Sequence, residues 1–364
     1  MVKKAQKAIC IFGAVFMLEQ VTYLDREIEG VLHGSDIEYI HRMRVASRRL
    51  RNGLQLFNDC LPKKKGSEWL KKVQKITSAL GNARDLDIQI ELLNQLYEDD
   101  LDAKYKPGYR RLLLRLKQQR ERAQKRVIKA INQLQESDLL SEMRGAFEKK
   151  SAGSESAYLW TPSLYQRAFR AVNRALEAFL VHQEHIHDPE NIEELHAMRI
   201  AGKNLRYTLE IFAPIYQKSI VPHITVMKDL QDQLGAIHDS DVWIAWLPEF
   251  IEKEQARIED YFGNTGPLKR LLPGIQHLAD DRQMARNLEY QSFLSTWENL
   301  EKEKTWETLV EIIKTPIRIE EALEYIPTPY DSKPPADIEL NAHQSASDQS
   351  QNSGKPADFE EDSA

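Results

Sequence analysis

Residues 41–57 read HRMRVASRRLRNGLQLF, and residues 196–212 read HAMRIAGKNLRYTLEIF. We call these stretches the first and second basic blocks, because they keep a histidine, three cations, a leucine and a phenylalanine in register. The matching residues are His41, Arg44, Arg48, Leu50, Arg51 and Phe57 in the first block, and His196, Arg199, Lys203, Leu205, Arg206 and Phe212 in the second. We infer an internal duplication whose shared cations have a function.

A second pair of matching stretches supports the duplication. LGNARDLDI at residues 80–88 corresponds to LGAIHDSDV at residues 234–242. The repeated unit is far longer than a solenoid repeat, so we expect two tandem subdomains at residues 5–150 and 160–315. The loop-like sequence SAGSES at residues 151–156 separates them.

Most of the chain shows helical spacing of apolar residues and few prolines or glycines. The helical stretches are residues 36–61, 67–98, 109–149, 163–188, 190–213 and 222–247. Strand-like alternation is not apparent, so the sequence predicts an all-α fold. Residues 328–364 are polar and acidic with few large apolar side chains, and we expect a disordered acidic tail there.

The formal net charge of −6, from 50 basic and 56 acidic residues, conceals an uneven distribution. Residues 331–364 contain eight acidic and two basic residues, so the rest of the chain is neutral and can carry a local basic surface. Two cysteines, Cys10 and Cys60, are too few to brace a chain of this size with disulfides, which favours a reducing cytoplasm. The apolar run at residues 8–18 is too short to span a bilayer, and we interpret it as a buried first helix without membrane contact.

On helices, the apolar and basic residues of each block fall on different faces. The expected core stripes are Met43, Ala46, Leu50, Leu54 and Phe57, and Met198, Ala201, Leu205, Leu209 and Phe212. No acidic residue lies between Glu38 and Asp59, or between Glu194 and Glu210. Like charges four residues apart destabilise a helix, so two acid-free basic faces indicate an anionic ligand.

The row from Arg44 to Arg51 is about 10 Å long at a rise of about 1.5 Å per residue, which matches a chain of several phosphates. Guanidinium groups present paired donors to phosphate oxygens, so the row favours an extended polyanion. Basic stripes on other helices are candidates for additional contacts, namely Arg115, Arg122, Arg126, Arg170, Arg174, Arg282 and Arg286.

The aspartates of the second pair of stretches admit two interpretations. Asp85, Asp87, Asp239 and Asp241, with His196 and His238, could hold a metal and form a metal-dependent phosphohydrolase. However, Arg84 stands where the second copy has His238, and arginine is not a usual metal ligand. We therefore expect no metal or cofactor, assign Arg84 and His238 to anion contact, and expect Asp85 and Asp239 to orient neighbouring arginines. We expect Gly81 and Gly235 to let two helices cross closely.

A third interpretation is a nucleic-acid-binding protein. Tyr207 is the only aromatic residue interleaved with the cations of the two blocks, whereas base-stacking surfaces interleave several. Nucleic acid is therefore the weaker candidate. The chain also lacks a glycine-rich phosphate loop and the common hydrolase motifs, which argues against an enzyme.

The motifs HxxRVxxxRLR and LGxxRDxD, with their second copies, resemble the CHAD family, the conserved histidine α-helical domain. The resemblance implies two tandem four-helix bundles, related by a pseudo-twofold axis, around a basic central cavity that binds inorganic polyphosphate at polyphosphate granules. The ligands it implies are His41, Arg44, Arg48, Arg51, Arg84, His196, Arg199, Lys203, Arg206 and His238. It also implies frequent partnership with a CYTH triphosphatase domain, and we recognise none, so we expect a stand-alone, non-catalytic module. Asn204 departs from the pattern because it replaces the cation matching Arg49.

Overall fold

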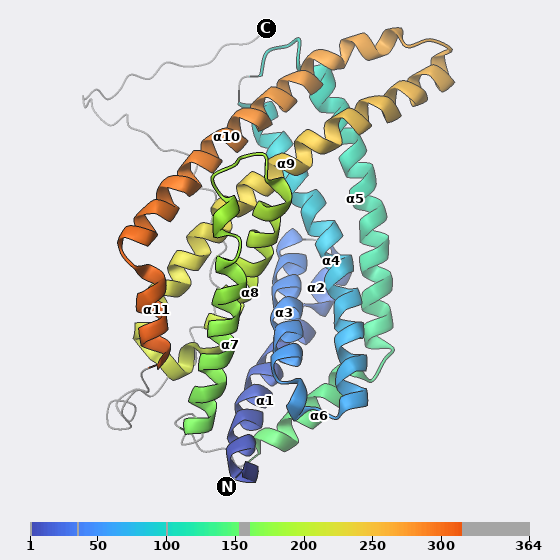
Figure 1. The fold of residues 1–364 in the computed structure, drawn as a ribbon. Coiled ribbons are helices and arrows are strands. Elements are labelled where there is room, and N and C mark those ends of the chain that lie inside the picture. The colour runs from blue at the N-terminus through green and yellow to red at the C-terminus, as the bar shows by residue number, and fades with distance from the viewer. Residues whose placement is uncertain (1, 35, 100, 153–160, 315–364) are drawn as a thin grey trace, which may run out of the picture. The chain divides into compact units, whose positions relative to one another are not determined.

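The computed structural model describes residues 2–34, 36–99, 101–152 and 161–314. Within these ranges every regular element is helical, which confirms the all-α prediction (Figure 1). The expected acidic tail at residues 328–364 lies outside the described residues, as does most of the expected linker.

The helices that precede the linker are α1 (Val2–Arg26), α2 (Ile28–His33), α3 (Ile37–Leu56), α4 (Lys63–Glu98), α5 (Lys106–Gln135) and α6 (Leu139–Ser151). Those that follow it are α7 (Pro162–Leu180), α8 (Ile192–Tyr216), α9 (Val221–Phe262), α10 (Leu272–Lys302) and α11 (Thr305–Lys314). Short 3-10 turns are η1 (Asn58–Cys60), η3 (Gln183–His185), η4 (Gln217–Ser219) and η5 (Gly266–Arg270). These elements belong to one compact unit, and the tandem four-helix bundles with domains at 5–150 and 160–315 stay a prediction.

The duplicated stretches form matching helices, since the basic blocks lie on α3 and α8 and the aspartate stretches on α4 and α9. Both core stripes are confirmed: each residue is buried except Ala201, which is half-buried. Phe57 at the end of α3 packs edge-on against Phe212 of α8, with ring centroids 6.2 Å apart. Phe12 of α1 stacks on Phe212 at 5.7 Å. The two basic blocks therefore end at one shared aromatic core.

The helix α1 is part of that core, as predicted for the apolar run at residues 8–18. Ala14, Met17, Val21 and Leu24 are at most 1% exposed. Within the part of the chain that the structure describes, one helical stretch, Gln6–His33, is long and apolar enough to cross a membrane, and half of it is buried in the protein. A core helix passes the same test of length and composition.

The interpretation of the two cysteines as too few to brace the chain with disulfides needs a correction. Cys10 of α1 and Cys60 of η1 form a disulfide, because η1 turns the chain at the end of α3 back against α1. The cysteine content therefore does not argue for a reducing compartment, and the cytoplasmic location stays a prediction.

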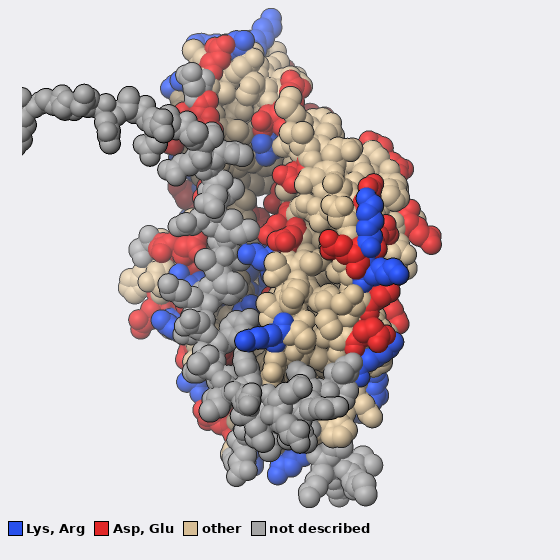
Figure 2. Space-filling model, turned by 90° about the vertical axis from the view of Figure 1, so that its left-hand side faces the viewer, with Lys and Arg blue, Asp and Glu red and all other residues tan. Residues whose placement is uncertain are grey.

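The surface charge is mixed on the face shown in Figure 2. Lys and Arg side chains alternate there with Asp and Glu over the tan surface, and they do not gather into one broad basic area.

A second apolar core, which includes Tyr109, Trp243 and Phe250, forms where α4 and α5 meet α9 and α10.

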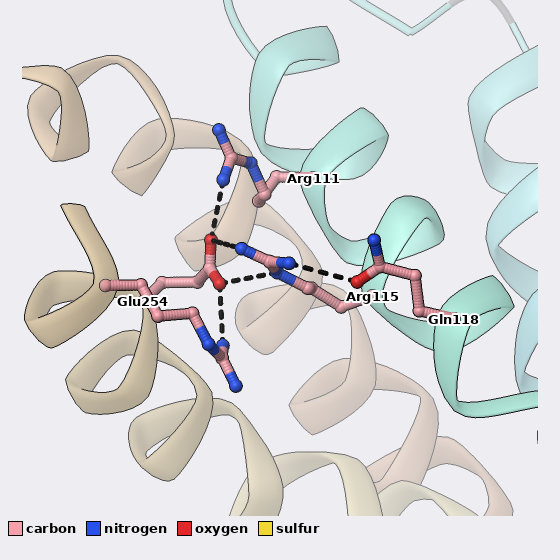
Figure 3. A network of polar contacts seen from close by, with 5 residues as sticks. Arg111, Arg115, Gln118 and Glu254 are labelled. Atoms are coloured by element: carbon pink, nitrogen blue, oxygen red, sulfur yellow. Dashed lines mark hydrogen bonds and ion pairs between the residues drawn. The ribbon is translucent and has the colours of Figure 1, made fainter. Parts of the chain in front are cut away.

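Beside this second core, Glu254 of α9 accepts hydrogen bonds from Arg115 and Arg111 of α5, at 2.7 and 2.9 Å (Figure 3). Arg257 donates to the same carboxylate at 2.7 Å. The Glu254 side chain is 0% exposed because these arginines cover it. Burial alone would raise the pKa of Glu254, but the hydrogen bonds and charges of the arginines outweigh burial and lower it. The network ties α5 to α9.

Candidate functional site

The two basic blocks meet because α3 and α8 lie against each other. Two guanidinium groups lie over the ring of Tyr207 of α8, with Arg48 of α3 at 5.4 Å and Arg206 of α8 at 5.3 Å from the ring centroid. Arg49 of α3 donates a hydrogen bond of 3.0 Å to Glu210 of α8. We use the name basic cluster for the cations that face each other here, Arg44, Arg48 and Arg51 of α3 and Arg199, Lys203 and Arg206 of α8.

The electrostatics of Lys203 show how close the two rows are. Burial, followed by the charges of Arg199, Arg48 and Arg44, lowers the pKa of Lys203 to about 6, while Asp239 opposes them. Arg44 and Arg48 belong to α3 and Lys203 to α8. Desolvation is the largest cause of this shift, and the named arginines, two of them on the other helix, add to it. The basic cluster is therefore a region of positive charge that its own carboxylates do not neutralise.

The arginines of the basic cluster feel the same environment. Burial lowers the pKa of Arg44 and of Arg51, and the neighbouring Arg48 is the next cause for both. Burial also lowers the pKa of Arg199, with Asp239 opposing and Arg48 adding to the effect. Guanidinium groups keep their protons in proteins, so the repulsion persists until an anion enters.

The first aspartate of each stretch lies near an arginine of the basic cluster, as predicted. Asp85 of α4 is 3.6 Å from Nη2 of Arg44 and is well exposed. Asp239 of α9 acts on the pKa of Arg199. Asp239 remains in contact with solvent. Desolvation of its carboxyl group by the surrounding protein nevertheless raises its pKa, and the charges of Arg199 and Lys203 oppose that shift. Each of these carboxylates thus acts on one arginine of the basic cluster from a neighbouring helix.

The glycines of the same stretches do not have the role predicted for them. A Cβ atom on Gly81 would meet only Nε of Arg44 within 4 Å, at 3.7 Å. A Cβ atom on Gly235 would meet only Nε of Arg199, at 3.9 Å. These are ordinary contacts, so no second helix backbone approaches closely. The matching arginines Arg44 and Arg199 lie next to these two glycines.

Arg84 and Arg199 have donors that the protein leaves unsatisfied. Among the described residues, no hydrogen-bond partner reaches Nε or Nη1 of Arg84, or Nε of Arg199. The nearest carboxylate to Arg84 is that of Glu38, at 3.9 Å from Nη1, which is beyond hydrogen-bond distance. Buried donors without acceptors are costly, and the oxygens of an anionic ligand can satisfy them.

His238 stands where the first copy has Arg84, and it pairs with His196. The two Nδ1 atoms are 3.0 Å apart. Burial lowers the pKa of His238 to about 4, with Arg199 as the next cause, and burial also lowers the pKa of His196. Both rings are therefore neutral at neutral pH, and only one can carry its proton on the shared Nδ1 contact. The other has its proton on Nε2, where it can donate to an anion. His41 occupies the place on α3 that matches His196.

The second aspartate of each stretch has a structural partner. Asp87 accepts a hydrogen bond from Arg120 of α5, and Asp241 from Arg286 of α10. Arg286 is 4% exposed and also donates to the carbonyl oxygen of Pro189 at 2.6 Å. Within the described ranges, no group of three or more His, Cys, Asp or Glu side chains is arranged to hold a metal. Asp87 and Asp241 thus fasten α4 to α5 and α9 to α10.

Three of the arginines predicted as additional contacts have carboxylate partners within the protein. Arg115 pairs with Glu254, Arg282 with Asp281, and Arg286 with Asp241. Their role as additional contacts stays a prediction. The other four are exposed, with Arg122 and Arg126 on α5 and Arg170 and Arg174 on α7. In the described part of the chain, no contact places these four in the cluster.

A cluster of cations shared by two duplicated helices is the candidate site of this all-α protein. The model of the CHAD domain matches residues 16–248. The chain therefore belongs to the CHAD family, which is related to polyphosphate.

Relatives and solved structures agree with this assignment. The chain is 27% identical over 211 residues to an uncharacterized protein of Mycobacterium tuberculosis strain CDC 1551 / Oshkosh, covering 52% of this chain and 36% of that protein. A protein of strain H37Rv, also uncharacterized, matches to the same extent. The chain thus spans about a third of the length of these relatives.

Two solved structures share the fold. The crystal structure of the CHAD domain from the plant Ricinus communis is similar with a TM-score of 0.55 and 20% identity, covering 78% of this chain and 91% of that one. PptA from Streptomyces chartreusis is similar with a TM-score of 0.52 and 14% identity, covering 80% and 99%. At these identities the likeness is one of fold.

Proposed function

We propose that this protein binds inorganic polyphosphate in the basic cluster and does not hydrolyse it. The observation that carries the proposal is the position of Lys203 of α8 beside Arg44 and Arg48 of α3, where burial and repulsion lower its pKa to about 6. Charges of one sign are held together here at a cost in stability. A dense polyanion that enters between the rows removes that repulsion.

An extended ligand fits the rows better than a compact one. Arg44 and Arg51 are separated by about 10 Å along α3, and Arg199 and Arg206 repeat this spacing on α8. Inorganic polyphosphate carries negative charge on every phosphate and has no bases to stack. The one aromatic side chain among the cations, Tyr207, has guanidinium groups within 5.4 Å of its ring centroid, so its face is not free for a nucleobase.

A binding role without catalysis follows from the engagement of the aspartates. Metal-assisted phosphoryl transfer needs clustered carboxylates that are free to hold the ion. Asp87 and Asp241 bind arginines of neighbouring helices instead, and Asp85 and Asp239 stand among cations. We therefore expect no phosphate release from polyphosphate with Mg²⁺ or Mn²⁺, and no change in binding on addition of EDTA.

A titration of the protein with fluorescent long-chain polyphosphate, followed by anisotropy, tests the proposal. Arg44→Glu/Arg199→Glu should abolish binding, since it places two carboxylates inside the basic cluster. Lys253→Glu/Lys302→Glu is the matched control, because it changes the net charge equally at exposed lysines that have glutamate partners. Full binding by the first variant, or equal loss by the control, would contradict a site in the basic cluster.

We also propose that the protein associates with polyphosphate granules in the cytoplasm, as its family implies. A fluorescent fusion should colocalise with granules stained for polyphosphate, and Arg44→Glu/Arg199→Glu should become diffuse. Granule association that survives this double substitution would show that another surface directs the location.

A further inference from the structure

Three of the positions at which the two basic blocks differ include side chains that make contacts between α3 and α8. Arg49 of the first block corresponds to Asn204, Asn52 to Tyr207, and Gln55 to Glu210. In the structure Arg49 binds Glu210, and Tyr207 stacks against Arg48. Arg49, Tyr207 and Glu210, which have no counterpart of the same type in the other copy, thus take part in joining α3 to α8.

Tyr207 is the centre of this contact. Its residue is 7% exposed, and guanidinium groups from both blocks lie at its ring, Arg48 at 5.4 Å and Arg206 at 5.3 Å from the centroid. Tyr207 also influences the pKa of Arg44, of Arg51 and of Arg199, after the larger effects of burial and other charges. One aromatic side chain thus lies among five arginines of the basic cluster.

The ring of Tyr207 can reduce the repulsion between the positive charges of Arg48 and Arg206. The π face of an aromatic ring attracts cations, so it lets two guanidinium groups approach that would otherwise repel each other. A guanidinium group whose carbon faces a ring still has N–H donors at its edge. The edge of the Arg48 guanidinium group can therefore still donate to phosphate oxygens while its carbon faces the ring. Glu210 adds a second link, because it binds Arg49 of α3 at 3.0 Å and lies 3.6 Å from Nε of Arg206.

We infer that Tyr207 is a positioning residue for polyanion binding, which holds Arg48 and Arg206 at a fixed separation so that the rows of both blocks act on one ligand. The inference rests on the proposed function. Tyr207 itself does not contact the anion in this account. Its effect passes through Arg48 and Arg206, and it depends on the ring and not on the hydroxyl group.

Three variants measured with the same polyphosphate titration test this inference. Tyr207→Phe keeps the ring and should bind within about twofold of the wild type. Tyr207→Leu removes the ring and should bind about tenfold more weakly, the effect expected when one cation–π contact is lost on each side. In an Arg48→Ala background the substitution Tyr207→Leu should cost less than it does in the wild type, since one of its two partners is already absent.

Thermal unfolding of each variant separates positioning from folding, with binding measured well below every midpoint. A folded Tyr207→Leu that binds like the wild type would overturn the inference, as would a Tyr207→Phe that loses as much affinity as Tyr207→Leu. Additive losses in the Arg48→Ala background would also overturn it. Failure of the wild type to bind polyphosphate would instead end the proposed function, so the two outcomes are distinct.

Discussion

Binding of polyphosphate should take up a proton at Lys203. In the free protein, burial and neighbouring arginines lower the pKa of Lys203 to about 6. A bound polyanion adds negative charge and raises that pKa toward its ordinary value of 10.5. The complex therefore binds more protons than the free protein, and affinity must fall as the pH rises above 6.

The size of the effect follows from the two pKa values. Lys203 is about half protonated at pH 6 and about one-hundredth protonated at pH 8, so affinity should drop about fiftyfold between them, or ~2.3 kcal/mol. Below pH 6 affinity should be level until the His196 and His238 pair begins to gain protons, since burial lowers the pKa of His238 to about 4. With long polyphosphate chains, protonation of the terminal phosphates contributes little to this pH dependence, because each chain has only two ends.

Isothermal titration calorimetry in two buffers of different ionisation enthalpy measures this uptake. At pH 8 the wild type should take up about one proton per bound chain segment at Lys203, and Lys203→Met should take up none there. Arg122→Met is a control that removes an exposed cation of α5. Proton release at pH 8, or the same pH dependence in Lys203→Met, would refute the reasoning.

Three further predictions concern stability. Lys203→Met should raise the free energy of unfolding at pH 7 by at least ~1 kcal/mol, because a lowered folded-state pKa makes this lysine destabilising below 10.5; a loss of stability would contradict this. Glu254→Gln should lower the free energy of unfolding, measured in urea, by ~3 kcal/mol without weakening polyphosphate binding. Because the pKa of Glu254 is lowered in the folded protein, the stabilisation by this carboxylate should be lost as the pH falls through that pKa. Unchanged stability of Glu254→Gln would show that Arg111 and Arg115 do not require a carboxylate partner. Cys10→Ser/Cys60→Ser should lower stability by ~3 kcal/mol under oxidising conditions, whereas an equal midpoint with and without reductant would argue against the disulfide.

The helical fold could be predicted from sequence because periodicity decides which residues are buried. Leu50 and Leu205 were placed in the core by spacing alone, and both are 0% exposed. Helix ends were harder. The expected helix at residues 109–149 is two helices, α5 and α6, and α9 passes through Pro248 to Phe262. Packing against α10 and α5 supports a helix that proline disfavours, and such packing is not visible in a single stretch of sequence.

The start of α3 shows the same limit on a smaller scale. The spacing of Ser35 and Glu38 predicts a capping box there. Ser35 lies outside the described residues. Asp36 caps α3, because its carboxylate accepts a hydrogen bond from the amide of Glu38 at 2.9 Å.

The site was predictable to the extent that it repeats. Duplication identifies the cations of both blocks, but it does not show that they share one space, which depends on how α3 packs on α8. Partners distant in sequence also decide which arginines are available. Arg286 is bound to Asp241, 45 residues away, and Arg115 to Glu254, 139 residues away. The differences between the copies, such as Asn52 and Tyr207, were the overlooked signal for the contact between them.

The stoichiometry of a single charge reversal tests most directly whether the two blocks build one site. In calorimetry with polyphosphate of one fixed length, Arg44→Glu should bind more weakly at every site, with the same number of chains bound per protein as the wild type. Half the wild-type number of chains, bound with unchanged affinity, would mean that α3 and α8 bind separate ligands and would contradict the shared cluster.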